Sequence, residues 1–160
     1  MVYLFIGGAS DTGKTTLISS IADSLIKNNG YVVSPNLRPI PANPNWDFIT
    51  ILEGLDQNGI HRRILINTAT DDLKKINELI VLRNQQPIVD VVITSIRDAG
   101  DPMRPPVLTG LNIKPIIDVT IEFPLAKVTR RKNPNAYVWY QSSALNLARH
   151  LLSLPPFSLY

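Results

Sequence analysis

The chain has 160 residues, of which 44% are hydrophobic and 18% are charged, and its net charge is +3. It has no apolar run of about 18 residues, which excludes a membrane-spanning helix, and no cysteine, which excludes disulfides and thiolate metal sites. Met1 leads directly into an apolar strand, so we expect no signal peptide, a cytoplasmic location and one domain over residues 1–160.

The first predicted element is a short buried strand, Val2 to Ile6, which leads into a glycine-rich motif. This motif, residues 8–15, reads Gly-Ala-Ser-Asp-Thr-Gly-Lys-Thr and fits G-x-x-x-x-G-K-[ST] at every fixed position. An apolar repeat of helical period then predicts a helix from about Lys14 to Asn28, which Gly30 ends. The motif therefore has the strand and the helix that it requires on either side.

The chemistry of this motif is phosphate binding. Glycines let the chain wrap closely around an anion, and backbone N–H groups and the positive end of the helix point toward it. Lys14 can reach the β- and γ-phosphates, and the Thr15 hydroxyl can coordinate Mg²⁺. The predicted phosphate-binding residues are Gly8, Ala9, Ser10, Asp11, Thr12, Gly13, Lys14, Thr15 and Thr16.

Over Val2 to Leu25 the chain resembles the P-loop NTPase superfamily, and beyond that segment the resemblance is one of topology. The resemblance implies a nucleotide partner, with ATP and Mg²⁺ as the cofactors.

A short second strand is predicted at residues 31–33, followed by a proline-rich loop, residues 34–44, whose four prolines exclude a helix or a central strand. This loop lies where small P-loop kinases bind their acceptor. Arg38 and Asp47 are therefore candidates for holding an anionic or hydroxylated substrate. The pattern over residues 47–57 fits either a helix or an extended segment, and we favour the helix.

A third strand is predicted from Arg63 to Ala69. Near its end stands Asn67, where phosphate-loop enzymes usually place an acidic residue that holds Mg²⁺ through water. An asparagine can accept a hydrogen bond from such a water but adds no charge. Thr70 is the predicted N-cap of the next helix, and Asp71 or Asp72 suits its first turn or could replace the missing acid.

The fourth predicted strand, Val89 to Ile96, precedes a long irregular segment from Arg97 to Pro115. Its end does not match the [NT]-[KQ]-x-D motif that reads guanine, because Arg97 occupies the fourth position, so ATP is the expected nucleotide. Arg97, followed by Arg104 in the same segment, is similar to the lid arginines of small kinases, which neutralise the transferring phosphoryl group.

A fifth strand is predicted from Ile116 to Phe123, then a short helix starting at Pro124 and a final helix from Tyr137 to Leu152. The short helix carries a basic cluster that is loosely similar to the last basic helix of nucleoside and nucleotide kinases. Without interleaved aromatic residues this cluster does not favour nucleic acid as a partner. The substrate candidates in it are Arg130 and Arg131.

Strands alternating with helices predict right-handed βαβ units and an α/β, three-layer sandwich, with about five mainly parallel strands and helices on both faces. Ligands of such folds lie beyond the carboxyl ends of the strands. The segments that follow strands, and so share that edge, are Arg38, Asn67 to Asp72, Ser95 to Asp98 and Pro124 to Arg131.

Three functions remain open. We favour kinase-like phosphoryl transfer from Mg-ATP to a small molecule or nucleotide, with Lys14, Arg97 and Asn67 as catalytic residues. A weak or switch-type ATPase is the second, because the chain is also similar to the branch of the molybdopterin-guanine-dinucleotide accessory protein and dethiobiotin synthetase. The third is a nucleotide-binding regulator without turnover, which the missing acid at Asn67 favours.

Overall fold

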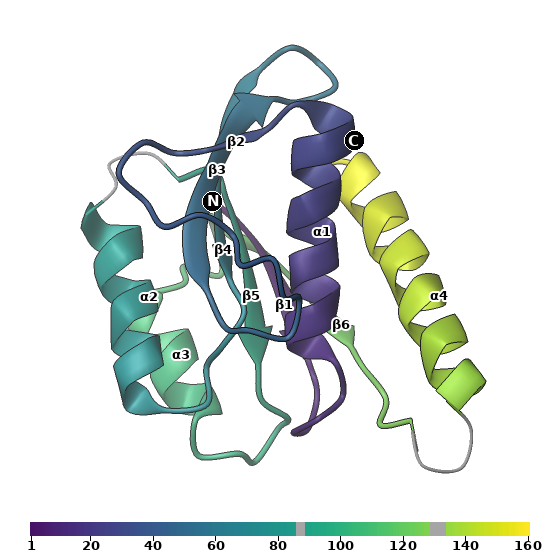
Figure 1. Ribbon diagram of the computed structural model, residues 1–160. Coiled ribbons are helices and arrows are strands. Elements are labelled where there is room, and N and C mark those ends of the chain that lie inside the picture. Colours follow the sequence, from purple (N-terminus) through teal and green to yellow (C-terminus); the bar gives the residue numbers. More distant parts are fainter. Residues whose placement is uncertain (86–88, 129–133) are drawn as a thin grey trace.

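Runs of aliphatic and β-branched residues form six strands among the described residues, and four helices accompany them (Figure 1). The structure is a computed structural model that describes residues 1–85, 89–128 and 134–160. The strands are β1 (Val2–Gly7), β2 (Val32–Val33), β3 (Ile49–Leu55), β4 (His61–Asn67), β5 (Val91–Ile96) and β6 (Val119–Pro124). The helices are α1 (Lys14–Asn29), α2 (Leu73–Gln85), α3 (Arg104–Gly110) and α4 (Pro134–Ser153). The predicted α/β class is confirmed.

The six strands form one sheet in the order β2-β3-β4-β5-β1-β6. The pairs β4–β5, β5–β1 and β1–β6 are parallel, whereas β2–β3 and β3–β4 are antiparallel. The prediction of about five mainly parallel strands therefore needs correction, because the sheet is six-stranded and mixed. Its parallel part brings the carboxyl ends of β1, β4 and β5 to one edge, where ligands of α/β folds bind.

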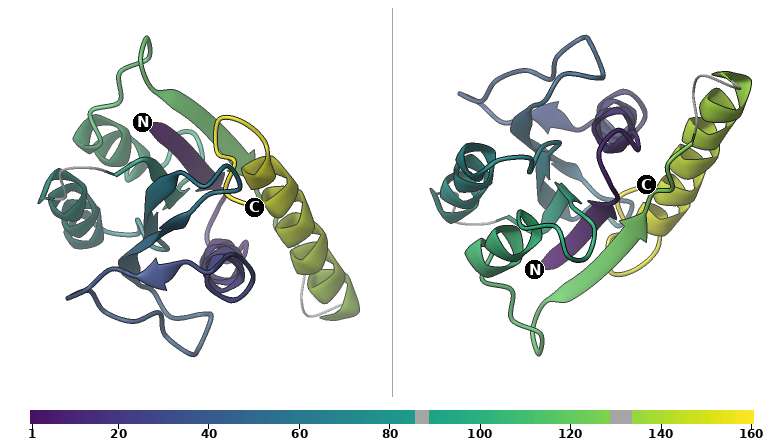
Figure 2. Two further views of the ribbon diagram at one scale, coloured as in Figure 1. Left: turned by 90° about the horizontal axis from the view of Figure 1, so that it is seen from above. Right: turned by 90° about the horizontal axis from the view of Figure 1, so that it is seen from below.

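Helices cover both faces of this sheet, α1 and α4 on one and α2 and α3 on the other (Figure 2). Leu17 and Leu25 of α1 belong to one buried cluster, which also includes residues of α4. Ile76 and Leu79 of α2 and Val107 of α3 belong to a second cluster across the sheet. Helices thus lie on both faces, as predicted. None of the helices in the described ranges combines the length and apolar character that crossing a bilayer requires.

The segment from Asp47 to Gln57, predicted as a helix, instead contains β3, which makes a hairpin with β4. Its turn is held by Asp56, whose Oδ1 accepts the N–H groups of Asn58 and Ile60 at 2.8 and 3.0 Å. Burial tends to raise the pKa of Asp56, but these hydrogen bonds and the Arg62 guanidinium leave that pKa below its ordinary value. The helical spacing of the apolar residues is outweighed because β3 gains a strand partner on each side.

The N-terminus of α2 also differs from the prediction. Asp72, not Thr70, caps the helix, because Asp72 Oδ1 accepts the N–H of Lys75 at 2.9 Å. The Thr70 hydroxyl is buried and donates to the Ser95 carbonyl oxygen at 3.3 Å. Thr70 therefore ties the end of β4 to the end of β5.

The secondary structure also differs from the prediction in two segments that contain prolines. The segment from Arg97 to Pro115, predicted to be irregular, contains α3, because Pro105 and Pro106 occupy the first turn, where a missing N–H breaks no helical bond. Pro124 ends β6 instead of starting a helix, and residues 125–128 have no regular structure.

Gly54 in β3 lets the sheet pack against the buried ring of Tyr31, and we expect Gly54→Ala to destabilise the protein. A Cβ atom there would lie 2.7 Å from Tyr31 Cδ1 and 3.1 Å from Tyr31 Cα. Overpacking of this kind costs about 1–3 kcal/mol in the free energy of unfolding. Urea denaturation measures the effect, with Leu55→Ala at an exposed position of the same strand as the control. Equal stability of Gly54→Ala and wild type would contradict this packing.

Candidate functional site

The glycine-rich motif joins the end of β1 to the start of α1 through backbone conformations that favour glycine. Gly8, Asp11 and Gly13 have φ angles of 144°, 62° and 90°. A Cβ atom on Gly8 would lie 2.8 Å from Thr12 Oγ1 and 2.9 Å from the carbonyl oxygen of Leu125. Only glycine fits at this position without displacing its neighbours.

The N-terminus of α1 has no side-chain cap. Gly13 precedes the helix in a left-handed conformation and makes no side-chain hydrogen bond to it, and the first turn contains no acidic residue. The first N–H groups of a helix lack intrahelical partners and carry partial positive charge. This end of α1 is therefore suited to an anion.

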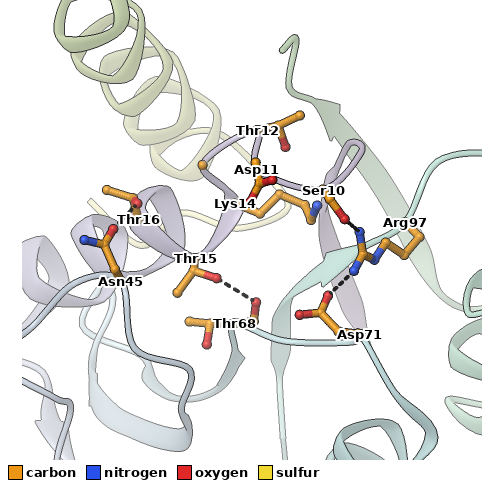
Figure 3. A pocket seen from close by; sticks show the side chains of 11 residues that line it. Ser10, Asp11, Thr12, Lys14, Thr15, Thr16, Asn45, Thr68, Asp71 and Arg97 are labelled. Carbon is orange, nitrogen blue, oxygen red and sulfur yellow. Dashed lines mark hydrogen bonds and ion pairs between the residues drawn. The ribbon is translucent and has the colours of Figure 1, made fainter. Parts of the chain in front are cut away.

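A pocket of about 270 Å³ lies over this helix end (Figure 3). Besides the glycine-rich motif, residues from the ends of β4 and β5 and from the segment after the proline-rich loop contribute to it. The lining residues are Ser10, Asp11, Thr12, Gly13, Lys14, Thr15, Thr16, Asn45, Thr68, Asp71 and Arg97. The structure thus brings Arg97 and most of the predicted phosphate-binding residues around one cavity.

Lys14 is buried at this pocket, and its ammonium group is held by the motif itself. Lys14 Nζ donates hydrogen bonds to the carbonyl oxygens of Gly8 and Ala9, at 2.7 and 2.6 Å. Burial, followed by repulsion from Arg97, lowers the pKa of Lys14 from its ordinary value. A nearby anion would relieve both effects, since it offsets lost solvation and positive charge.

Arg97 reaches the pocket from the end of β5. Its guanidinium donates to Ser10 Oγ and, at 2.7 Å, to Asp71 Oδ1, so it bridges the glycine-rich motif and the segment before α2 (Figure 3). Arg97 Nε is buried and has no hydrogen-bond partner among the described residues. The side chain therefore lies at the pocket with an unused donor.

Arg104 does not line this pocket. Its guanidinium donates to both carboxylate oxygens of Glu122, at 3.0 and 2.6 Å, and to the carbonyl oxygen of Arg97 at 2.8 Å. Its hydrogen bond is the largest influence holding the pKa of Glu122 below its ordinary value. Arg104 therefore supports the backbone of Arg97 instead of facing the cavity.

Asn67 is the last residue of β4, which ends before the predicted Ala69, and the Asn67 amide group hydrogen-bonds within the protein. Asn67 is buried, and its Nδ2 donates to the carbonyl oxygen of Ala69 at 2.9 Å and to Thr94 Oγ1 at 3.0 Å. It does not line the pocket over α1. Thr68, the next residue, does, and its carbonyl oxygen lies 3.5 Å from Thr15 Oγ1 (Figure 3).

Asp47 lies beside Thr15. Asp47 Oδ1 accepts the Thr15 hydroxyl at 3.2 Å, and Asp47 Oδ2 accepts Lys75 Nζ at 2.7 Å. The hydrogen bond to Asp47 is the largest influence raising the pKa of Lys75 above its ordinary value. Lys75 also lies 3.9 Å from Asp71, which in turn pairs with Arg97. Polar contacts thus run from Thr15 to Asp47 and then through three ion pairs to Arg97.

A second cavity, of about 260 Å³, adjoins Asp47 under the proline-rich loop. Arg38 and Asp47, the two predicted substrate residues of this region, both line it. The full lining is Arg38, Pro39, Pro41, Asp47, Phe48, Ile49, Asn67, Ala69, Lys75 and Glu78. The cavity therefore combines an apolar floor with two cations and two carboxylates.

Two residues of this region are not predicted from the sequence, namely Asn45 and Lys75. Asn45 Oδ1 accepts the Thr16 hydroxyl at 3.0 Å across a separation of 29 residues, which no local pattern indicates. Lys75 stands four residues after Asp71 on a helical segment, and that spacing is the one local signal for it. The predicted substrate residues Arg130 and Arg131 lie outside the described residues.

No group of three histidine or acidic side chains within the described ranges could hold a metal ion by itself.

A comparison of the chain with models of known protein families, with curated proteins and with solved structures finds no match in any of the three. The interpretation of this site therefore depends on its residues and their geometry.

Proposed function

We propose that the chain is a P-loop NTPase that binds Mg·ATP at the glycine-rich motif and transfers the γ-phosphoryl group to a small acceptor. One observation carries the proposal. The motif, the uncapped start of α1, Lys14 and Arg97 converge on a single pocket. Phosphoryl transfer depends mainly on positioning and charge neutralisation, and these groups supply both.

The residues present fit a triphosphate. The first N–H groups of α1 have no side-chain acceptor, and Arg97 Nε is a buried donor without a partner among the described residues. When bound, Mg·ATP supplies the phosphoryl group and a metal that offsets its charge. Thr15 Oγ1, already within hydrogen-bonding distance of a carboxylate, is the hydroxyl that would coordinate the metal.

In this proposal each side chain has a defined task. The backbone N–H groups of the motif and Lys14 hold the phosphates, because residues 10–16 line the pocket. Arg97 neutralises the charge that develops during transfer, and Asp71 orients the Arg97 guanidinium. The second cavity would hold the acceptor, with Arg38 and Lys75 facing an anionic group on it.

A weak or switch-type ATPase, or a regulator without turnover, is the second candidate. The observation that favours it lies at the end of β4. There the Asn67 side chain is uncharged, and its amide group donates hydrogen bonds to Ala69 and Thr94. An enzyme without a fixed acid at that point depends more heavily on its arginines and on closure over the acceptor.

A single-turnover reaction with γ-labelled ATP and a mixture of small metabolites separates these functions. Label in an organic product would support transfer, label only in inorganic phosphate would support an ATPase, and unchanged bound ATP would support a regulator. Failure to retain ATP at all would refute the proposed binding site.

The nucleotide base provides a separate prediction. Because Arg97 stands where a guanine-reading aspartate would be required, ATP should bind at least as tightly as GTP. Competition between the two against a fluorescent ATP analogue measures this. A preference for GTP of about tenfold, or 1.4 kcal/mol, would show that the loop after β5 reads guanine in another way.

A further inference from the structure

We infer that Asp47 supplies the carboxylate of the Mg²⁺ site beside Thr15, a role that rests on the proposed function. In the usual arrangement this acid stands at the end of a buried strand, where this chain has Asn67. The contact that points to Asp47 is direct, since its Oδ1 lies 3.2 Å from Thr15 Oγ1. Mg²⁺ prefers oxygen ligands and is typically held by one or two carboxylates together with phosphate oxygens and water.

Two other carboxylates near the pocket are engaged elsewhere. Asp71 Oδ1 pairs with Arg97 at 2.7 Å, and Asp72 Oδ1 caps α2. Asp11 projects from the glycine-rich motif and makes no hydrogen bond to Thr15 in the described structure. Among the described residues, Asp47 is thus the acid that contacts the hydroxyl expected to coordinate the metal.

The chain holds Asp47 in this place from both sides. Before it, Pro44 accepts the Ser19 hydroxyl at 3.0 Å through its carbonyl oxygen, which ties the end of the proline-rich loop to α1. After it, the N–H of Phe48 donates to Thr68 Oγ1 at 2.8 Å, and the N–H of Thr68 donates back to the Phe48 carbonyl at 3.0 Å. A residue fixed in this way loses little further entropy when it binds a metal.

Lys75 and Thr15 contact different carboxylate oxygens of Asp47. Lys75 occupies Asp47 Oδ2 at 2.7 Å and leaves Oδ1 directed at Thr15. Because no three acidic or histidine side chains gather among the described residues, the metal also needs the phosphate oxygens. Metal binding should therefore depend on the nucleotide.

The test measures Mn²⁺ affinity by electron paramagnetic resonance, with the protein saturated with a non-hydrolysable ATP analogue. Asp47→Asn should weaken Mn²⁺ binding about 10- to 100-fold, the range typical of losing a side chain that hydrogen-bonds to a metal ligand, as Asp47 does to Thr15. Asp72→Asn is the matched control, because it removes a neighbouring negative charge, keeps a good helix cap and should leave Mn²⁺ affinity unchanged. Equal affinities of Asp47→Asn and wild type would overturn the inference.

Two further measurements keep the outcomes distinct. In EDTA, wild type and Asp47→Asn should bind the ATP analogue with the same affinity. If wild type binds no analogue, with or without metal, the proposed function itself is refuted. In wild type carrying the analogue, Mg²⁺ should shift the side-chain carboxyl carbon signal of Asp47 but not that of Asp72. A shift at Asp72 alone would assign the metal to the start of α2 and refute the role of Asp47, whatever the stability of the variants.

Discussion

We expect Mg·ATP to stabilise the wild-type protein against thermal unfolding and Lys14→Ala to abolish this stabilisation. A ligand that binds only the folded state at a hundredfold excess over its Kd stabilises that state by about 2.7 kcal/mol. Lys14 is the buried cation of the pocket, with an ammonium group that contacts two carbonyl oxygens of the glycine-rich motif. In the proposed site this charge balances the phosphates. Loss of Lys14 should leave the fold intact, since among the described residues its side-chain hydrogen bonds are to the motif.

Thermal unfolding with and without millimolar Mg·ATP measures this effect. Lys27→Ala is the control, because Lys27 is an exposed residue of the same helix that forms an ion pair with Asp23. Lys27→Ala should show the same increase in unfolding midpoint with Mg·ATP as the wild type. A wild-type protein whose midpoint responds to neither ATP nor GTP would show that the motif does not bind nucleotide. A Lys14→Ala variant that keeps the shift would place the phosphates elsewhere.

The parts of the fold that local sequence predicts well are those that local chemistry determines. Gly30 ends α1 in a left-handed conformation with φ 71°, as its position after the apolar repeat predicts. The strand, glycine-rich motif and helix over Val2 to Asn29 also follow the predicted order, because each depends on neighbouring residues. Asn67 likewise falls at the end of its strand.

The parts that sequence predicts poorly depend on distant partners. Residues 49–55 carry a spacing that suits a helix, yet they form β3, because β2 and β4 offer hydrogen bonds on both sides. The pairing of Asp47 with Thr15 joins residues 32 apart, and that of Arg97 with Ser10 joins residues 87 apart. The edge rule for parallel sheets anticipates the meeting of Arg97 and the motif, but no local rule anticipates the position of Asp47.

Arg97→Ala should lower the single-turnover rate of phosphoryl transfer or ATP hydrolysis about a thousandfold, which is within the range that arginines supply in such reactions. The affinity for ATP should change little, because we propose that the motif and Lys14 hold the ground-state phosphates. Arg97 is already directed at the pocket by Asp71 and Ser10, and Arg104 supports its backbone. The structure therefore directs the Arg97 side chain to the pocket.

Arg97→Lys gives the matched comparison, since lysine keeps the positive charge but lacks the planar fork that contacts Ser10 and Asp71 together. We expect its rate to lie between those of wild type and Arg97→Ala. Quenched-flow measurement of product formation, with ATP affinity determined in parallel, separates the effect on the rate from any effect on binding. A fast wild-type reaction that both substitutions leave unchanged would remove Arg97 from the chemistry. Asp71, which would lose its arginine partner in Arg97→Ala, would then be the next side chain of this pocket to replace.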